Sequence, residues 1–403
     1  MKNIHVIFDS SIISPSPVRI GILSIESISG RGTRFRFVFD EEWLAKYSSI
    51  ILDPYTMSEN YSDKLTFPFI KDSFPDRWGQ TLIIRKLSRK AEKEGMRARL
   101  TSDLDFLLGV DDFTRKGSIR FCDEAGTFLS DDETSVPPLS RLGEYSEMIA
   151  DYEKYGVNCK WLEDFYSSSS SLGGARPKLN VLDNDGNLWI AKVPSLNDQY
   201  DVGGWEEVAA ILARKAGIDV ADTMVIKHGN GHHTLLSKRF DREGTNRLHM
   251  ASLASFTRKE SNSASFLDIA EIISRYSAKP DYDLKELYKR LVFSAFINNT
   301  DNHLHNHAFL LTREGFALSP AYDMNPSIHG RDSVLMIDEG IHHFDVSSIR
   351  ETAPYYDLSA NEATEIIDKT EEVVSTWKNE AINLGIRKDE ISLMRSAFSL
   401  RCS

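Results

Sequence analysis

The stretch NNTDNHLHNHAFLLTREGFALSPAYDM, residues 298–324, decides the fold class and the chemistry expected of this chain. In the segment before it, apolar residues recur every three or four positions from Leu284 to Phe296, which predicts a buried helix. Two short apolar runs follow, Ala308–Leu311 and Phe316–Leu318, with Thr-Arg-Glu-Gly between them as a hairpin turn. We therefore expect a helix, a polar loop, a hairpin and a second polar loop.

Three residues of this stretch, Asp301, Asn306 and Asp323, carry its chemical signal. Asn306 follows Asp301 by five positions, and Asp323 comes after the hairpin. Phosphoryl transfer needs a group that orients the attacking hydroxyl, together with hard oxygen ligands for Mg²⁺, and protein kinases supply these groups in this order. We expect Asp301 to accept or orient the hydroxyl proton, and Asn306 and Asp323 to hold Mg²⁺ on the phosphates of ATP. The alternative is a solvated loop between a core helix and a hairpin.

A second chemical site is expected at SSSSSLGGARPKLNV, residues 167–181. Gly173 and Gly174 allow a close backbone approach, so successive N–H groups can cradle phosphate oxygens, and Arg176 and Lys178 add positive charge. The next residues indicate strand, turn and strand, as in a kinase nucleotide lobe, rather than the strand–loop–helix of a Walker P-loop. Without that context, the serine run would indicate only a flexible linker.

Lys192 lies in the apolar run Trp-Ile-Ala-Lys-Val-Pro, where it fits a phosphate-binding lysine or a solvent-facing lysine at a sheet edge. Residues 203–217 show helical spacing, and Gly217 is placed to end the helix. A kinase needs an acidic partner for its lysine in this helix. Glu206 and Glu207 are both candidates, and either could instead be a carboxylate favoured by the helix macrodipole.

Composition bounds the class of protein. The 403 residues predict two or three domains, and 41% hydrophobic with 27% charged residues is typical of a soluble globular protein. A formal net charge of −12 argues against strong nucleic-acid binding by this chain alone. The three scattered cysteines favour a reduced, cytoplasmic protein. The apolar start is too short for a signal peptide, and no stretch approaches the length of a membrane span.

These motifs, together with SFPDRWG (73–79), WIAKVP (189–194) and KRFDR (238–242), resemble the signature of the HipA family, the serine/threonine-kinase toxins of bacterial toxin–antitoxin pairs. The matches run in the family's order from about residue 70 to the C-terminus. The resemblance implies an α+β fold with a bilobal, protein-kinase-like body. Its expected parts are a β-rich N-terminal subdomain (1–125), a connecting segment (126–165), a nucleotide-binding N-lobe of antiparallel strands (166–243) and a helical catalytic C-lobe (244–403). Within that C-lobe, Ser359 and Glu362 have the spacing of a capping box, and an apolar stripe from Ile366 to Leu384 predicts helical scaffold.

The resemblance also assigns roles to individual residues. Asp301 would be catalytic, Glu206 is favoured over Glu207, and the backbone of Lys238–Phe240 would meet adenine. Ser171 would be an autophosphorylated serine whose phosphate silences the enzyme, with Ser169 as an alternative. The residues implied to bind the nucleotide are Gly173, Gly174, Ala175, Arg176, Lys178, Lys192, Glu206, Lys238, Arg239, Phe240, His303, Asn306, Tyr322 and Asp323.

Two positions depart from the family pattern. Asn302 stands where Asp is frequent, and His305 stands where Lys or Arg is usual, so less fixed positive charge would face the γ-phosphate at pH 7. The alternation of His303, His305 and His307 could also indicate a zinc site, although zinc requires three converging ligands.

The function implied is an ATP- and Mg²⁺-dependent kinase that phosphorylates a translation protein, such as an aminoacyl-tRNA synthetase. A HipB-like helix-turn-helix antitoxin would neutralise it and make most of the contact with DNA. The alternatives are a nucleotide-binding pseudokinase acting as scaffold or co-repressor, and a small-molecule kinase.

Overall fold

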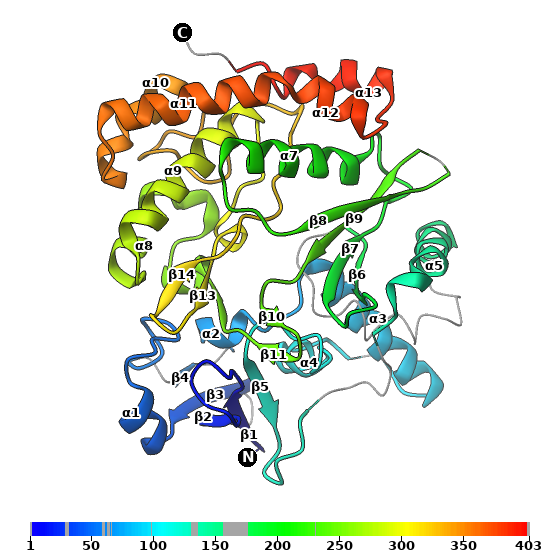
Figure 1. Cartoon of the computed structure of the whole chain (residues 1–403). Helices are drawn as coiled ribbons and strands as arrows, with labels where there is room; N and C mark the ends of the chain where they lie inside the picture. Colours follow the sequence, from blue (N-terminus) through cyan, green and yellow to red (C-terminus); the bar gives the residue numbers. More distant parts are fainter. Residues whose placement is uncertain are drawn as a thin grey trace. The chain divides into compact units, whose positions relative to one another are not determined.

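The computed structural model describes residues 2–28, 32–58, 61, 62, 65, 67–97, 99–129, 136–155, 176–229 and 231–400. The chain forms two compact units. Unit 1 contains Met1–Leu196 and Asp241–Ala251, and unit 2 contains Asn197–Phe240 and Ser252–Ser403. Figure 1 labels the helices and strands of both units. The four-part division expected from the sequence is finer than these two units and stays a prediction.

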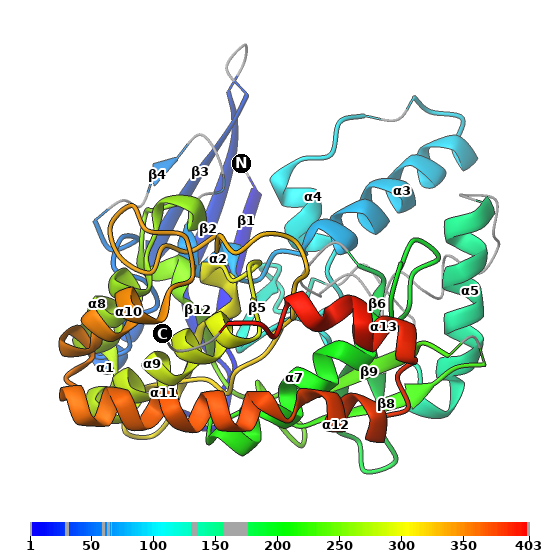
Figure 2. The same cartoon turned by 90° about the horizontal axis from the view of Figure 1, so that it is seen from above.

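Unit 1 contains a five-stranded antiparallel sheet, visible near the N-terminus in Figure 2. In β1, side chains 4, 6 and 8 are buried while those between them are less so, because alternate residues of a strand face opposite sides. Phe35 and Phe37 are buried, and the Phe37 ring lies 5.2 Å from that of Phe69. The order of the strands in the sheet is β4 (Tyr61–Ser62), β3 (Gly32–Phe39), β2 (Val18–Ile28), β1 (Lys2–Phe8) and β5 (Ile119–Cys122).

Side-chain caps begin two of the helices of unit 1. Asp76 caps α3 by accepting a hydrogen bond from the N–H of Gly79 at 2.7 Å, and Ser102 begins α4 with a capping box. Trp78 is buried, with its ring 5.9 Å from that of Tyr152. The helices are α1 (Glu41–Tyr47), α2 (Pro68–Lys71), α3 (Arg77–Lys93), α4 (Asp103–Leu108) and α5 (Leu142–Tyr155).

Two hairpins complete unit 1. The antiparallel pair β6 (Lys178–Leu182) and β7 (Leu188–Lys192) confirms the strand–turn–strand expected after the glycine loop. The short pair β10 (Arg242–Glu243) and β11 (Asn246–Arg247) lies in the segment 241–251, and β12 (Met250–Ser252) follows it.

Unit 2 is mainly helical. Its first helix, α7 (Val202–Ala216), ends at Gly217, whose φ of 82° lies in the left-handed region that favours glycine. The expected hairpin is confirmed as β13 (Ala308–Leu311) paired with β14 (Phe316–Leu318), and it follows the buried helix α9 (Pro280–Phe296). The other elements are the hairpin β8 (Thr223–Lys227) and β9 (His233–Lys238), with helices α8 (Phe266–Tyr276), α10 (Val346–Glu351), α11 (Ala360–Ser375), α12 (Trp377–Asn383) and α13 (Lys388–Leu393).

The C-terminal helices modify one expectation. Ser359 does form a capping box with Glu362, but the apolar stripe from Ile366 to Leu384 is divided between α11 and α12. The hydroxyl of Thr376 donates to the carbonyl of Val373 at 2.7 Å where the two helices meet. Figures 1 and 2 both show α11 and α12 beside α7. Among the described residues, none of the helices has the length and apolar character needed to cross a membrane.

Candidate active site

The polar loop after α9 is held by its asparagines. The chain leaves α9 through Asn298, whose φ of 53° is a left-handed conformation that Asn tolerates. The side-chain amide of Asn298 donates to the carbonyls of Ser327 and Gly330, both at 2.7 Å. Asn306 is buried and donates its side-chain N–H to the carbonyl of Asp301 at 3.2 Å. The five-residue spacing of Asp301 and Asn306 thus forms one closed turn.

The segment after β14 fixes the same loop by backbone contacts. The N–H of Val334 donates to the carbonyl of Thr300 at 2.9 Å, and the N–H of Leu335 to that of Asn302 at 3.1 Å. Loop 298–306 therefore rests on helix α9 on one side and on residues 327–335 on the other.

Asn302, which departs from the family pattern, belongs to a buried neutral network. Its oxygen accepts a hydrogen bond from Nε2 of His307 at 2.9 Å, and its side-chain nitrogen donates to the hydroxyl of Ser294 at 3.1 Å. Burial, and secondarily Arg290 and His303, lowers the pKa of His307 to about 3, so the imidazole is neutral at pH 7. An amide suits this neutral partner, because a carboxylate at 302 would favour a buried charge.

Asp323 follows the hairpin in a left-handed conformation, with a φ of 58°. Ala321, two residues before Asp323, is bound to the segment that precedes β8. Its N–H donates to the carbonyl of Asp219 at 2.7 Å, and its carbonyl accepts from the N–H of Ala221 at 3.0 Å. The side-chain amide of Asn325 donates to Oδ1 of Asp323 at 3.1 Å. These hydrogen bonds hold the backbone before Asp323 and one oxygen of its carboxylate.

Tyr322 ties this second loop to the first. Its hydroxyl donates to the backbone carbonyl of His305 at 2.6 Å, and its ring centroid lies 5.4 Å from that of Phe240. Phe240 comes two residues after β9, in the segment expected to meet adenine. The structure therefore brings Phe240, Tyr322 and the 301–306 loop together within unit 2.

The carboxyl groups of Asp301 and Asp323 interact electrostatically. Asp301 is an exposed residue, yet partial burial of its carboxyl group raises its pKa, and the negative charge of Asp323 raises it further. His303 acts in the opposite direction. Two carboxylates that disfavour each other's charge form a site at which a cation would be stabilised.

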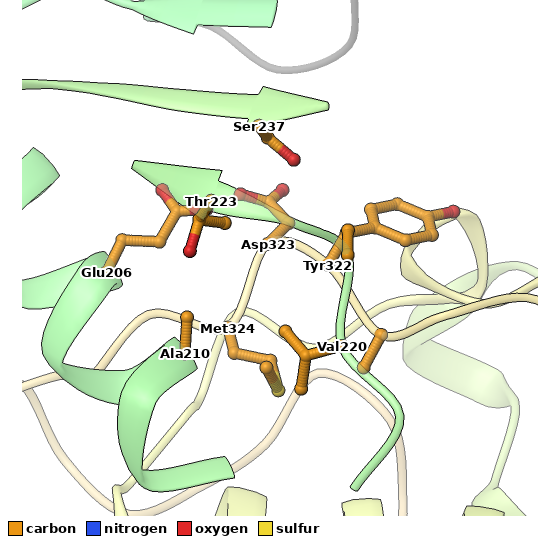
Figure 3. Close-up of a pocket in the computed structure, with 10 residues that line it drawn as sticks. Glu206, Ala210, Val220, Thr223, Ser237, Tyr322, Asp323 and Met324 are labelled. Atoms are coloured by element: carbon orange, nitrogen blue, oxygen red, sulfur yellow. The ribbon is translucent and has the colours of Figure 1, made fainter. Parts of the chain in front are cut away.

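A small pocket joins Asp323 to helix α7. Figure 3 shows Glu206 and Asp323 pointing into it from α7 and from the loop after β14. Thr223 and Ser237 add hydroxyl groups to the lining. Glu207 instead lies 3.8 Å from Arg214, and burial raises the pKa of its carboxyl group. Of the two glutamates left open by the helix spacing, Glu206 is the one in the pocket.

The basic residues expected to bind phosphate lie in unit 1. Lys178 and Lys192 are cross-strand partners in the β6–β7 hairpin, so their side chains share one face. Lys178 is buried and forms an ion pair with Asp76 at 3.2 Å. Arg176 is half-buried just before β6. Residues Ser169, Ser171, Gly173, Gly174 and Ala175 lie outside the described residues.

The motif 238–242 is divided between the units, with residues 238–240 in unit 2 and residues 241 and 242 in unit 1. Lys238 ends β9 and donates its N–H to the carbonyl of Asp222 at 2.8 Å, and Arg239 is buried in unit 2. In unit 1, Asp241 and Arg242 form an ion pair at 2.8 Å, and Asp241 also accepts the N–H of Gly117 at 2.7 Å.

Sequence reasoning missed the residues that support the loops. Asn298, Asn325, Thr223 and Ser237 were given no role. Asn325, two positions after Asp323, could have been found as an Asx partner of that carboxylate. Thr223 and Ser237 carried no signal, because they reach the pocket only through pairing of β8 with β9, in which they are direct partners.

Comparison with known proteins gives a consistent picture. A family model described as HipA-like C-terminal domain matches residues 170–377. A protein of Sinorhizobium fredii (strain NBRC 101917 / NGR234), named "Putative kinase Y4dM", is 29% identical over 199 residues, with 41% of this chain and 48% of that protein covered. "Toxin YjjJ" of Escherichia coli (strain K12) is 27% identical over 179 residues, with 42% of this chain and 40% of that protein covered. The chain thus spans less than half the length of these curated relatives.

Among solved structures, a match covers nearly the whole chain. It is that of the Shewanella oneidensis MR-1 toxin–antitoxin system, HipA with HipB and operator DNA. The TM-score is 0.66 at 16% identity, and the match covers 97% of this chain and 95% of the other. At this identity the likeness shows the fold, and it confirms the expected α+β, kinase-like class.

Proposed function

The chain belongs to the family with a HipA-like C-terminal domain, and we propose that it is an ATP- and Mg²⁺-dependent serine/threonine protein kinase. One observation carries this proposal. Asp301, Asn306 and Asp323 lie together on two loops: the hydrogen bond of Asn306 closes the first loop, and that of Tyr322 joins the second loop to the first. That is the donor set that phosphoryl transfer requires.

The donor chemistry fits Mg²⁺. Asp323 supplies a carboxylate, and because Nδ2 of Asn306 is engaged by Asp301, the ligand atom of Asn306 would be Oδ1. Both are hard oxygen ligands, and the mutual repulsion of Asp301 and Asp323 would be relieved by a cation. When bound, the ion would neutralise charge on the ATP phosphates.

The residues of this chain then have separate tasks. Asp301 would accept or orient the proton of the attacking serine or threonine hydroxyl. Lys192, with Glu206 as its acidic partner, would bind the ATP phosphates, together with the glycine loop 173–175, Arg176 and Lys178. The backbone of residues 238–240 would meet adenine, Tyr322 would pack under the nucleotide, and His303 would hold the loop. Because Lys178 also pairs with Asp76, only part of its positive charge would act on the phosphates.

We further propose the biological setting of a toxin. The chain would act as the toxin of a HipA/HipB-type pair, with a helix-turn-helix antitoxin making most of the DNA contact. The matched complex, which contains HipA, HipB and operator DNA, supports this partner. A translation protein such as an aminoacyl-tRNA synthetase would be the substrate. Phosphorylation of Ser171 or Ser169 would silence the enzyme by placing negative charge beside the nucleotide phosphates.

Labelled ATP tests this proposal. Phosphate-free purified protein is incubated with labelled ATP and Mg²⁺, alone and with a cell extract, and labelled residues are mapped by mass spectrometry. The wild type should label, while Asp301→Asn should not. Asp368→Asn is the matched control, because that exposed carboxylate lies in α11 of the same unit, and it should label like the wild type. Label within residues 167–171 supports self-silencing. A wild type that labels nothing, in itself or in the extract, contradicts kinase function and favours a nucleotide-binding scaffold.

A further inference from the structure

We infer that the C-terminal tail, residues 377–400 with helices α12 and α13, positions the helix that carries Glu206. Within this tail, Trp377 and Phe398 are positioning residues for this glutamate. The consequence for activity rests on the proposed kinase function. The structural part of the inference, that the tail orders α7, stands independently of it.

An aromatic cluster forms the first anchor. Trp205, directly before Glu206 in α7, is buried, and its ring lies 5.9 Å from Trp377 and 6.0 Å from Phe398. Trp377 and Phe398 stack on each other, with ring centroids 4.6 Å apart and planes 10° from parallel. Since neighbouring residues on a helix lie about 100° apart around its axis, any rotation of α7 that moves Trp205 also moves Glu206.

A buried carboxylate of α13 forms the second anchor. Glu390 accepts the backbone N–H of Asp201 at 2.8 Å, and Asp201 is the residue that caps α7 by accepting from Gly204 at 3.1 Å. Arg387 holds the other oxygen of Glu390 at 3.1 Å. Asp201 and Glu390 are both buried, so this contact is shielded from water. The N-terminus of α7 is therefore fixed by a residue 189 positions away in the chain.

The same tail also reaches the segment that follows Asp323. The hydroxyl of Ser399 accepts a hydrogen bond from Arg331 at 2.5 Å, directly after Phe398 in the chain. Residues 327–335 in turn hold the loop of Asp301. One short stretch of tail thus contacts the helix of Glu206 and the segment that supports the catalytic loop.

Removing an anchor should leave α7 in place for only part of the time. A centre that is competent in a tenth of the molecules turns over about ten times more slowly. Because Glu206 would position the lysine that binds the ATP phosphates, kcat should fall, and the KM for ATP should rise by no more than the same factor. A purely structural role would instead lower thermal stability and leave kcat per folded molecule unchanged.

The test compares variants in the tail. Phe398→Ala removes the ring, and Phe398→Leu keeps most of the apolar volume. Leu393→Ala is the matched control, because Leu393 is a tail residue with 45% of its surface exposed. Glu390→Ala and Glu390→Gln form a second pair, since glutamine retains an acceptor for Asp201, and they serve if Phe398→Ala does not fold. The readouts are kcat and KM per folded molecule, and hydrogen exchange of residues 202–216.

In Phe398→Ala and Glu390→Ala we expect about a tenfold lower kcat and faster hydrogen exchange of α7. Phe398→Leu and Glu390→Gln should recover most of both losses. Leu393→Ala should match the wild type. Unchanged exchange of α7 and unchanged kcat in both alanine variants would overturn the inference. If the wild type transfers no phosphate, the proposed function fails and the exchange measurement alone decides. Unchanged protection of α7 then overturns the inference, and loss of protection supports it.

Discussion

The side-chain amide of Asn306 donates a hydrogen bond to the backbone carbonyl of Asp301, at 3.2 Å. This contact does two things at once. It closes the loop that presents Asp301, and it commits Nδ2 of Asn306, which leaves the amide oxygen for a cation. The proposed magnesium site therefore requires a residue at 306 that is both a donor and an acceptor.

Asn306→Asp should abolish most phosphotransfer although it keeps an oxygen ligand. Aspartate has no N–H for the carbonyl of Asp301, and it adds a third negative charge beside Asp301 and Asp323. We expect at least a roughly 100-fold slower transfer, the order seen when an oriented catalytic group is lost. Initial rates with labelled ATP measure this change, and a variant within threefold of the wild type would show that the amide donor is dispensable.

As the pH is lowered, phosphotransfer should be lost at a higher pH than it would be if Asp301 had the pKa of an ordinary aspartate. In the proposed mechanism the ionised form of Asp301 is the active one, and burial of its carboxyl group, together with the charge of Asp323, raises its pKa. Activity is therefore present above the raised pKa and is lost as pH falls through it. The pH profile of kcat/KM tests this, with far-UV circular dichroism at each pH to exclude unfolding. A rate that stays constant down to about pH 4 would contradict the assignment of Asp301.

Folding stability should decline as the solution becomes acidic, in part through His307. Its folded pKa of about 3 lies below the unfolded value near 6.5, so the unfolded state binds more protons and stability is lost as pH falls from about 6.5 towards 3. Each such histidine contributes a slope of up to about 1.4 kcal/mol per pH unit. Urea unfolding at pH 5 and 6.5 should give a shallower dependence for His307→Gln. The exposed His329 provides the control substitution, and equal slopes in the wild type and His307→Gln would refute this role.

Asp76 should matter for stability before it matters for catalysis. It caps α3 and pairs with the buried Lys178, so Asp76→Ala removes both the cap and one side of a buried ion pair and costs about 3–5 kcal/mol. Asp76→Asn keeps the cap acceptor and should cost about 1 kcal/mol less. Adding Lys178→Met to Asp76→Asn should restore part of the loss, because a buried positive charge is then replaced by an apolar side chain. Denaturant midpoints measure the stability of all three variants. If the double variant is no more stable than Asp76→Asn, the ammonium of Lys178 is stabilised by other groups.

Much of the fold could be predicted because its signals are local. The stripe in α9, the hairpin β13–β14 and the cap at Ser359 depend on residues within a few positions of each other. The pair Asp301 and Asn306 is local in the same sense. Such features are set by periodicity, caps and turns, which a single sequence displays.

The supporting contacts could not be predicted, because they join distant parts of the chain. Asp76 and Lys178 are 102 positions apart, and Asp201 and Glu390 are 189 apart. In neither pair do the residues adjacent in sequence indicate which distant residue will be the partner. The positive φ angles of Asn298 and Asp323 were missed for a related reason, since they are imposed by contacts of residues 327–335 and of Ala321 with other elements.

The central claim is that Asp301 and Asp323 act as parts of one phosphotransfer centre, and a double-mutant comparison tests it most directly. The rate of label transfer from ATP is measured for wild type, Asp301→Asn, Asp323→Asn and the double variant, with folding checked in each. Residues that act as a unit are not additive, so the double variant should be about as slow as the slower single variant. If either single variant keeps the wild-type rate, or if the double variant shows the product of two independent losses, the claim of a single centre is contradicted.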